Sequence, residues 1–148
     1  MNAKAALSLR LGLATVTLVA SMLVTGVAAS PAEAASSAWF SSPSRNIGCV
    51  MALTGVRCDV ITYTYTPPPQ PAWCDFGWGP SIGVGKTGRG HFRCVSDTVA
   101  GAPTPILGYG ASRIIGRFRC TSRTTGMRCV NTLNGHGFRI SKPSYSLF

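Results

Sequence analysis

Hydrophobic and polar residues alternate along two segments of the chain, each centred on a pair of cysteines. Cys49 and Cys58 bracket eight residues, and so do Cys120 and Cys129. Alternation with a period of two is typical of a β-strand with one buried face. Each segment therefore predicts a β-hairpin with its two cysteines opposite each other. The predicted opposite pairs are Ile47 with Val60, Cys49 with Cys58 and Met51 with Val56 in the first hairpin, and Phe118 with Asn131, Cys120 with Cys129 and Ser122 with Met127 in the second.

A glycine stands at the end of each predicted turn. Gly55 and Gly126 both follow a threonine and precede the second strand of their hairpin. A residue in the left-handed region closes a short hairpin connection, and glycine adopts this conformation without steric cost. We therefore expect a left-handed conformation at both positions, as part of a weak internal repeat.

Other segments predict further strands and connections. The alternation changes phase at Val60-Ile61, which predicts a β-bulge, and prolines in 67–71 predict a rigid strap rather than a ligand for a partner. Residues 35–44, with Trp39 and Phe40, are expected to dock at the edge of the core. The remaining predicted elements are a hairpin of 81–85 with 90–96, with Val84 near Phe92 and Ile82 near Cys94, an irregular loop over 101–110, a strand from Arg113 and a last strand over 138–140.

Helical periodicity is missing from the sequence after residue 34. The predicted fold class is therefore all-β. The pattern indicates a small disulfide-clipped antiparallel sheet, barrel or sandwich built from hairpins.

The first 34 residues have the three parts of a secretory signal peptide. Lys4 and Arg10 supply positive charge, residues 11–29 are apolar, and Ala32-Glu33-Ala34 offers a cleavage site. We expect cleavage after Ala34, a single secreted domain over 35–148, and no transmembrane segment after cleavage. The alternative is a membrane-anchoring helix, because the apolar run is about long enough to span a bilayer.

The six cysteines lie in residues 35–148. An even number in an exported chain predicts three disulfides, for which fifteen pairings are possible. We predict pairing between neighbours, as Cys49–Cys58, Cys74–Cys94 and Cys120–Cys129. A zinc site is the alternative, but the spacing contains no C-x-x-C pair. No metal or cofactor is therefore predicted.

Positive charge dominates residues 35–148. Of the 14 basic and 4 acidic side chains, residues 1–34 hold Lys4, Arg10 and Glu33, which leaves 12 basic and 3 acidic ones. Arginine binds carboxylate and phosphate oxygens in a bidentate fashion. The candidate anion-binding residues are Arg117, Arg119, Arg123, Arg128 and Arg139, most of which face away from the core in the predicted second hairpin. The alternative is a face that serves only solubility.

Catalytic motifs are not recognisable in the chain, and no catalytic residue is predicted. Asp59, Asp75 and Asp97 are expected to cap backbone N–H groups rather than to form the pair of acids of a hydrolase. The Gly-rich run 83–90 lacks the spacing of a phosphate-binding loop. His136, between two glycines, is the best single candidate for a functional side chain, but a turn histidine bonded to a carbonyl is the alternative.

Several longer strings point to a known family. They are Ser42-Pro43-Ser44-Arg45-Asn46-Ile47-Gly48-Cys49, Gly55-Val56-Arg57-Cys58-Asp59, the prolines before Cys74, Asp97-Thr98, Gly108-Tyr109-Gly110, Gly126-Met127-Arg128-Cys129-Val130-Asn131 and Gly135-His136-Gly137-Phe138. Together they resemble a small exported domain of unknown function found in actinobacteria. Glycine is usual in that family at position 45 and before Asp97, where this chain has Arg45 and Ser96. The resemblance implies export and paired cysteines, and it brings no catalytic residue.

Two classes of function follow from these features. The first is a secreted, non-enzymatic binding module associated with the cell envelope, whose partner is an anionic polymer, a lipid surface or an acidic protein; export disfavours nucleic acid. The second is a secreted inhibitor or antagonist of a hydrolase, in which the loop 86–89 enters the cleft of its target. A hydrolase activity of the protein itself is the less favoured alternative.

Overall fold

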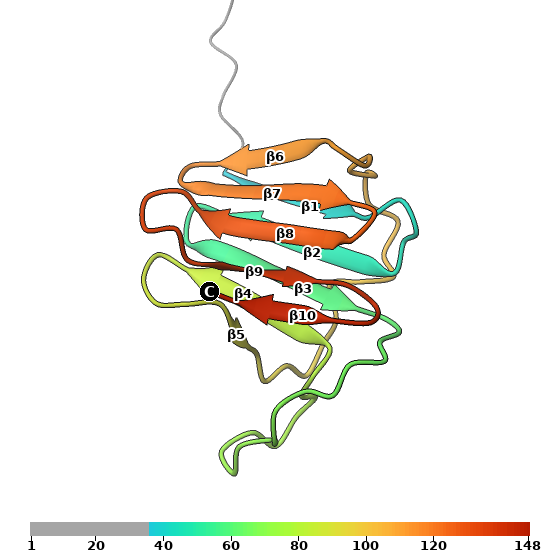
Figure 1. Ribbon diagram of the computed structural model, residues 1–148, viewed down its shortest axis with the longest axis vertical. Coiled ribbons are helices and arrows are strands. Elements are labelled where there is room, and N and C mark those ends of the chain that lie inside the picture. Colours follow the sequence, from blue (N-terminus) through green and yellow to red (C-terminus); the bar gives the residue numbers. More distant parts are fainter. Residues whose placement is uncertain (1–35) are drawn as a thin grey trace, which may run out of the picture. The chain divides into compact units, whose positions relative to one another are not determined.

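β-Strands form all the regular structure in the part of the chain that the computed structural model describes, residues 36–148 (Figure 1). The predicted signal peptide lies outside these residues. The strands are β1 Ser37–Ser41, β2 Ile47–Ala52, β3 Gly55–Val60, β4 Ser81–Gly85, β5 His91–Phe92, β6 Ser112–Ile115, β7 Phe118–Arg123, β8 Gly126–Asn131, β9 Gly137–Ile140 and β10 Tyr145–Leu147. No helix in residues 36–148 is long and apolar enough to cross a membrane.

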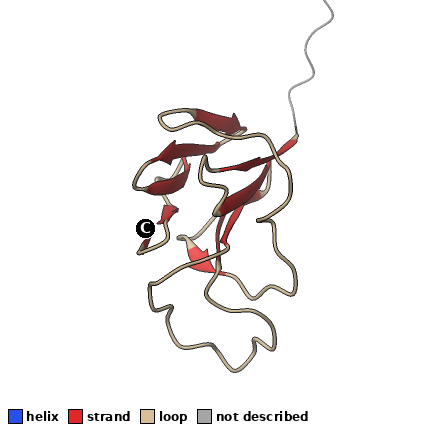
Figure 2. Cartoon of the chain, turned by 90° about the vertical axis from the view of Figure 1, so that its right-hand side faces the viewer, coloured by secondary structure: helices blue, strands red, loops and turns tan. Residues whose placement is uncertain are grey.

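The strands form two five-stranded antiparallel sheets. Sheet one has the order β1-β2-β3-β4-β5, and sheet two has the order β10-β9-β8-β7-β6. Each sheet follows the order of the chain, so every connection within it joins neighbouring antiparallel strands; residues 61–80, between β3 and β4, form the longest of these connections. The two sheets pack face to face (Figures 1 and 2), and one core cluster contains side chains from both. The structure confirms the predicted all-β class and resolves it as a sandwich.

The two cysteine hairpins have the predicted register. Cys49 pairs with Cys58 in β2 and β3, and Cys120 pairs with Cys129 in β7 and β8. Because side chains alternate across a strand, the residues in step with these cysteines also face the core. Phe118, Met127 and both cysteine pairs have no exposed surface.

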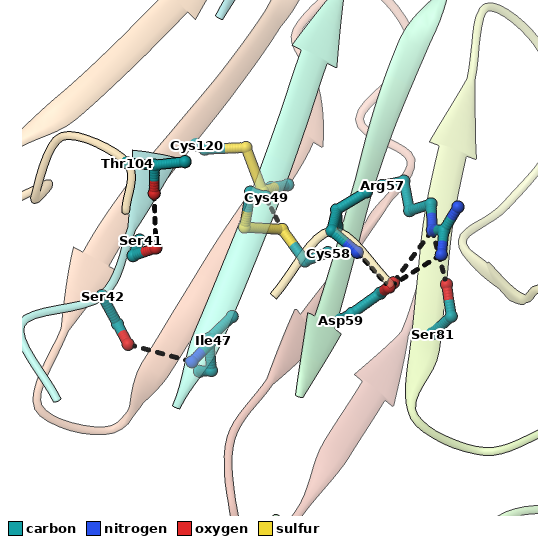
Figure 3. Close-up of a disulfide and its surroundings, with 12 residues drawn as sticks. Ser41, Ser42, Ile47, Cys49, Arg57, Cys58, Asp59, Ser81, Thr104 and Cys120 are labelled. Carbon is teal, nitrogen blue, oxygen red and sulfur yellow. Dashed lines mark hydrogen bonds and ion pairs between the residues drawn. A yellow bond between two sulfur atoms is a disulfide. The ribbon is translucent and has the colours of Figure 1, made fainter. Parts of the chain in front are cut away.

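Three disulfides join the cysteines in the pairs that the sequence predicted, Cys49–Cys58, Cys74–Cys94 and Cys120–Cys129. Two of them meet at the centre of the sandwich, where Cys58 Sγ lies 3.8 Å from Cys129 Sγ. Each disulfide joins two strands of one sheet, and the two disulfides pack against each other in the core between the sheets (Figure 3).

Two of the four edge strands, β1 and β10, were not predicted. Residues 37–41 form β1, which pairs with β2, and β10 pairs with β9 after the strand that was expected to be the last. Phe40 is buried as expected, whereas Trp39 is 48% exposed. Ala38 and Phe40 of β1 and Tyr145 and Leu147 of β10 contact the core, but five and three residues are too few to establish a period of two in the sequence.

Three local predictions were wrong. Ile82, not Val84, pairs with Phe92, and the strand expected over 90–96 is only His91–Phe92. The chain leaves β4 after Phe92 because Cys94 is bonded to Cys74 and Val95 pairs with Gly77. The chain does not continue past a bulge at Val60; β3 ends there, and Ile61 is exposed. Gly126 has the expected positive φ, at 124°, but Gly55 does not. A side chain at Gly55 is instead excluded by the carbonyl oxygen of Val84, 2.8 Å from where its Cβ would lie.

Candidate anion-binding site

Charge is distributed unevenly along the two sheets. All the acidic residues of the described part, Asp59, Asp75 and Asp97, precede sheet two. From Thr98 to Phe148 the chain has seven basic side chains and no acidic one. These seven are Arg113, Arg117, Arg119, Arg123, Arg128, Arg139 and Lys142. Sheet two therefore carries positive charge that no carboxylate on its own strands opposes.

Three of the five predicted arginines lie on the outer face of sheet two. Arg119 and Arg128 are exposed, on strands whose alternate residues are buried. Arg128 lies directly opposite Arg139 of β9. Like charges in this position repel each other and destabilise a sheet. The pair is therefore a place where an anion would be stabilising.

The side chains of Arg128 and Arg139 each make contacts that fix their orientation. The guanidinium carbon of Arg128 lies 4.8 Å from the centre of the Phe148 ring, a cation–π contact. Arg139 donates to the carbonyl oxygen of Thr125 at 2.9 Å and to Ser144 Oγ at 3.3 Å. Arg139 thus ties the β7–β8 turn to the β9–β10 turn.

These two turns form one wall of a cleft with a volume of about 640 Å³. Arg123, Thr124 and Thr125 line it from the first turn, and residues 141–144 line it from the second. The other wall comes from sheet one, through the segments that precede β2 and follow β3. A backbone hydrogen bond from Thr64 N to the carbonyl oxygen of Lys142, at 2.8 Å, holds the walls together. The cleft therefore exists only because the two sheets pack against each other.

Residues with polar or cationic side chains make up most of the cleft lining. Its cations are Arg123, Arg139 and Lys142, and no aspartate or glutamate lines it. Its hydroxyl groups come from Ser42, Ser44, Thr62, Tyr109, Thr124, Thr125, Ser141 and Ser144. Within residues 36–148, neither the guanidinium of Arg123 nor the ammonium of Lys142 has a hydrogen bond or an ion pair. Both are available to a ligand.

Arg45 adds a strained turn beside the cleft. It has a φ of 58°, in the left-handed region that side chains other than glycine seldom adopt. Its N–H donates to the carbonyl oxygen of Ser42 at 2.9 Å. The turn places its neighbours Ser44 and Asn46 in the cleft wall. This is one of the two positions at which the related family was expected to have glycine.

The structure places the five predicted arginines in three different surroundings. Arg123 and Arg139 reach the cleft, whereas Arg119 and Arg128 remain on the open face. Arg117 lies half-buried in the turn before β7. The sequence prediction missed Lys142 and the hydroxyl groups of the far wall. The lack of acidic residues after Asp97 was the signal that could have included Lys142.

Sheet one has an arginine whose charge is neutralised instead. Arg57 donates to both carboxylate oxygens of Asp59, at 3.0 and 2.7 Å (Figure 3). It also donates to Asp97 Oδ1 at 2.9 Å. Hydrogen bonding and charge from Arg57 lower the pKa of Asp97. Asp59 also accepts a hydrogen bond from Val99 N at 2.9 Å, so its predicted capping role is confirmed. The two aspartates serve to hold this arginine and the following loop.

The two histidines and the sulfur atoms of the core disulfides contact only nearby groups. His91 Nδ1 lies 3.2 Å from the carbonyl oxygen of Arg89. His136 bonds to its neighbours through its backbone, with its N–H donating to Asn134 Oδ1. The sulfurs of Cys49, Cys58 and Cys129 lie within 4.8 Å of one another, a spacing that could hold a metal ion. As disulfides, however, they offer no thiolate, which is the form that binds metals.

Residues 18–148 match the sequence profile of DUF6636, a family of unknown function. The chain belongs to this family. The resemblance seen in the sequence is thereby confirmed as far as a family of unknown function; the export and actinobacterial occurrence that it implied stay predictions. No curated protein and no solved structure matches the chain. Membership of DUF6636 assigns no activity or ligand, so the function must be argued from the cations and the cleft.

Proposed function

We propose that this DUF6636 protein is an extracellular, non-enzymatic binding module that holds an anionic partner at the cell envelope. The observation that carries the proposal is the absence of any acidic side chain among the seven basic ones after Asp97. Uncompensated guanidinium groups favour carboxylate or phosphate oxygens, which they bind in pairs. The partner is an anionic polymer of the envelope, a lipid surface or an acidic protein.

An extracellular location is supported by the three disulfides. Disulfides persist in oxidising compartments and are rare where thiols are kept reduced. Export also separates the protein from most nucleic acid, which is therefore the less favoured polyanion.

Retention on purified cell walls tests the proposal. Arg119→Glu with Arg128→Glu reverses charge on the open face, and Arg123→Glu with Lys142→Glu reverses it in the cleft. The matched control is Lys86→Glu with Arg89→Glu, which makes the same change of charge in an exposed loop of sheet one. We expect one or both of the sheet-two variants to lose roughly tenfold or more of the retention at low salt, and the control to lose much less.

Two results would contradict the proposal. Equal losses in all three variants would mean that only the net charge matters. Full retention of both sheet-two variants would mean that these cations do not bind the envelope. Unchanged thermal unfolding of each variant establishes that the fold is preserved.

The inhibitor hypothesis has one observation in its favour. Residues 86–89 are exposed, and the base of this loop is held by Asn131, whose amide donates to the carbonyl oxygens of Gly85 at 3.3 Å and Lys86 at 3.0 Å. An exposed loop with a fixed base is suited to entering the cleft of an enzyme with little loss of entropy. Stoichiometric inhibition of a wall hydrolase or protease, abolished by Lys86→Glu with Arg89→Glu, would support this second function.

A further inference from the structure

We propose that the cleft between the two sheets binds a saccharide unit that carries a carboxylate or phosphate group. This inference rests on the proposed function and assigns the cleft, rather than the open face, as the place where the ligand is recognised. It follows from three properties of the lining: unpaired cations, unpaired hydroxyl groups and apolar surface supplied by an aromatic ring and by aliphatic carbon atoms.

The cations provide the site for the acidic group. Arg123 comes from the end of β7 and Lys142 from the β9–β10 turn, so they belong to two different elements of the same wall. Neither side chain has a partner in the described part of the chain. Arg139 is different, because its bonds to Thr125 and Ser144 make it a positioning residue that holds the two turns together. The absence of carboxylates from the lining leaves the charge of Arg123 and Lys142 uncompensated.

The hydroxyl groups provide the site for the sugar. Thr62 and Thr124 lie on opposite walls, both are exposed, and the described residues give their hydroxyl groups no hydrogen bond. Asn46 fixes the backbone at Thr62 from both sides: its amide donates to the carbonyl oxygen of Thr62, and its own oxygen accepts from Thr62 N, each at 2.9 Å. A hydroxyl both donates and accepts, as the hydroxyls of a sugar do. A bare phosphate would use only donors.

Size and apolar surface also favour a sugar. The volume of about 640 Å³ lies in the range of clefts that hold small organic ligands, roughly 300 to 1,000 Å³. A bare inorganic anion would leave most of it unfilled. Ile47, Pro143 and the half-exposed Tyr109 are apolar or aromatic residues of the lining, and the aliphatic carbon atoms of its polar and charged side chains supply further apolar surface. An aromatic ring at the edge of a polar cleft can pack against the apolar face of a sugar ring.

Calorimetric titration of the folded, oxidised protein at physiological salt tests the assignment. The probes are trigalacturonate, which carries carboxylates; its fully methyl-esterified form, which has the same sugars without the charge; glucose 6-phosphate, which carries a phosphate; and glucose. We expect at least one acidic sugar to bind roughly tenfold or more tightly than its neutral counterpart. The two acidic probes distinguish a carboxylate from a phosphate on the sugar.

Three double variants locate the binding. Arg123→Gln with Lys142→Gln should weaken binding of the acidic sugar by roughly tenfold or more, since both charge-assisted contacts are lost. Thr62→Val with Thr124→Val keeps shape and charge, and should weaken binding of the acidic sugar. Binding of tripolyphosphate, a reference anion without a sugar, should be unchanged in this variant. Arg119→Gln with Arg128→Gln is the control; it removes the same charge outside the cleft and should change the affinity by less than about twofold.

Failure of this inference is distinguishable from failure of the proposed function. If neither acidic sugar binds, or if the Thr62/Thr124 variant binds the sugar as well as the unmodified protein does, the assignment of the cleft to a saccharide is overturned. If acidic ligands bind but depend on Arg119 and Arg128 alone, the cleft assignment is overturned while the proposed function stands. If no variant affects retention on cell walls, the proposed function fails as well.

Discussion

Arg57 and Arg128 occupy the same position of the internal repeat and have opposite electrostatic surroundings. Each directly precedes the second cysteine of its hairpin, in Val56-Arg57-Cys58 and Met127-Arg128-Cys129. The interiors of the two hairpins are alike, with the same cysteine register and a Cα–Cα distance of 4.1 Å across each pair. The exteriors differ, because two residues after Arg57 the chain has Asp59, and two residues after Arg128 it has Val130.

The inner and outer faces of the two hairpins differ because they are under different packing constraints. The inner faces must fit one another at the centre of the core, where the two disulfides touch, so a change on one side is felt on the other. The outer faces have no such partner. Sheet one uses Arg57 to fix a loop through Asp59 and Asp97, whereas no carboxylate side chain pairs with the arginines of sheet two in the described residues.

The largest expected effect is a difference in stability between the two arginines. Arg57→Gln leaves Asp59, only 2% exposed, without its charged partner, and should lower the free energy of unfolding by about 3 kcal/mol or more. Arg128→Gln should change it by less than about 0.5 kcal/mol, since Arg128 is exposed and pairs with no carboxylate. Denaturant unfolding of both variants measures the contrast; similar losses would show that the two sites are not electrostatically distinct.

The two hairpin disulfides should matter about equally. Cys49→Ala with Cys58→Ala and Cys120→Ala with Cys129→Ala each open a disulfide between residues nine apart. In the chain-entropy model, each should cost about 3 kcal/mol of stability. Chemical denaturation of the two double variants, compared at equal pH, tests this. A loss under about 1 kcal/mol in only one of them would show that the two hairpin interiors do not contribute equally to stability.

A single substitution should make the outer face of sheet two resemble that of sheet one. Val130→Asp places a carboxylate two residues after Arg128, as Asp59 follows Arg57. We expect retention on cell walls to fall by less than about twofold, because the ligand is recognised in the cleft and the new charge on the open face only weakens the general attraction to an anionic partner. Val130→Asn is the control for polarity without charge. A loss of roughly tenfold or more in Val130→Asp alone would place the binding on the open face and not in the cleft.

The smallest expected effect concerns Asp97, whose side chain is 72% exposed. Because Arg57 lowers the pKa of Asp97 in the folded protein, the pair stabilises the fold at pH values above the ordinary pKa of aspartate. This contribution is lost as the pH falls through the lowered pKa. Asp97→Asn should therefore melt at a slightly lower temperature than the unmodified protein near neutral pH, and the difference should disappear in acid. A difference that persists below about pH 2 would contradict the linkage.

Local pattern was enough to predict much of the fold and less of the candidate site. The two hairpins followed from the alternation around Cys49, Cys58, Cys120 and Cys129, because a strand has a fixed period of two. The arginine-bearing face followed from the same parity. The edge strands β1 and β10 did not, because they are too short to establish a period and their order comes from neighbouring strands.

By itself, the sequence determined the all-β class, the register of both cysteine hairpins and the neighbour pairing of the disulfides, since each depends on residues close together in the chain. Only the tertiary structure decided which outward groups share a site. Thr62 and Lys142 are 80 positions apart, and they meet because the packing of the sheets brings the end of sheet one against the turns of sheet two. Local periodicity carries no information about such a meeting, because it specifies the face of a strand and not the strand that will lie across the core.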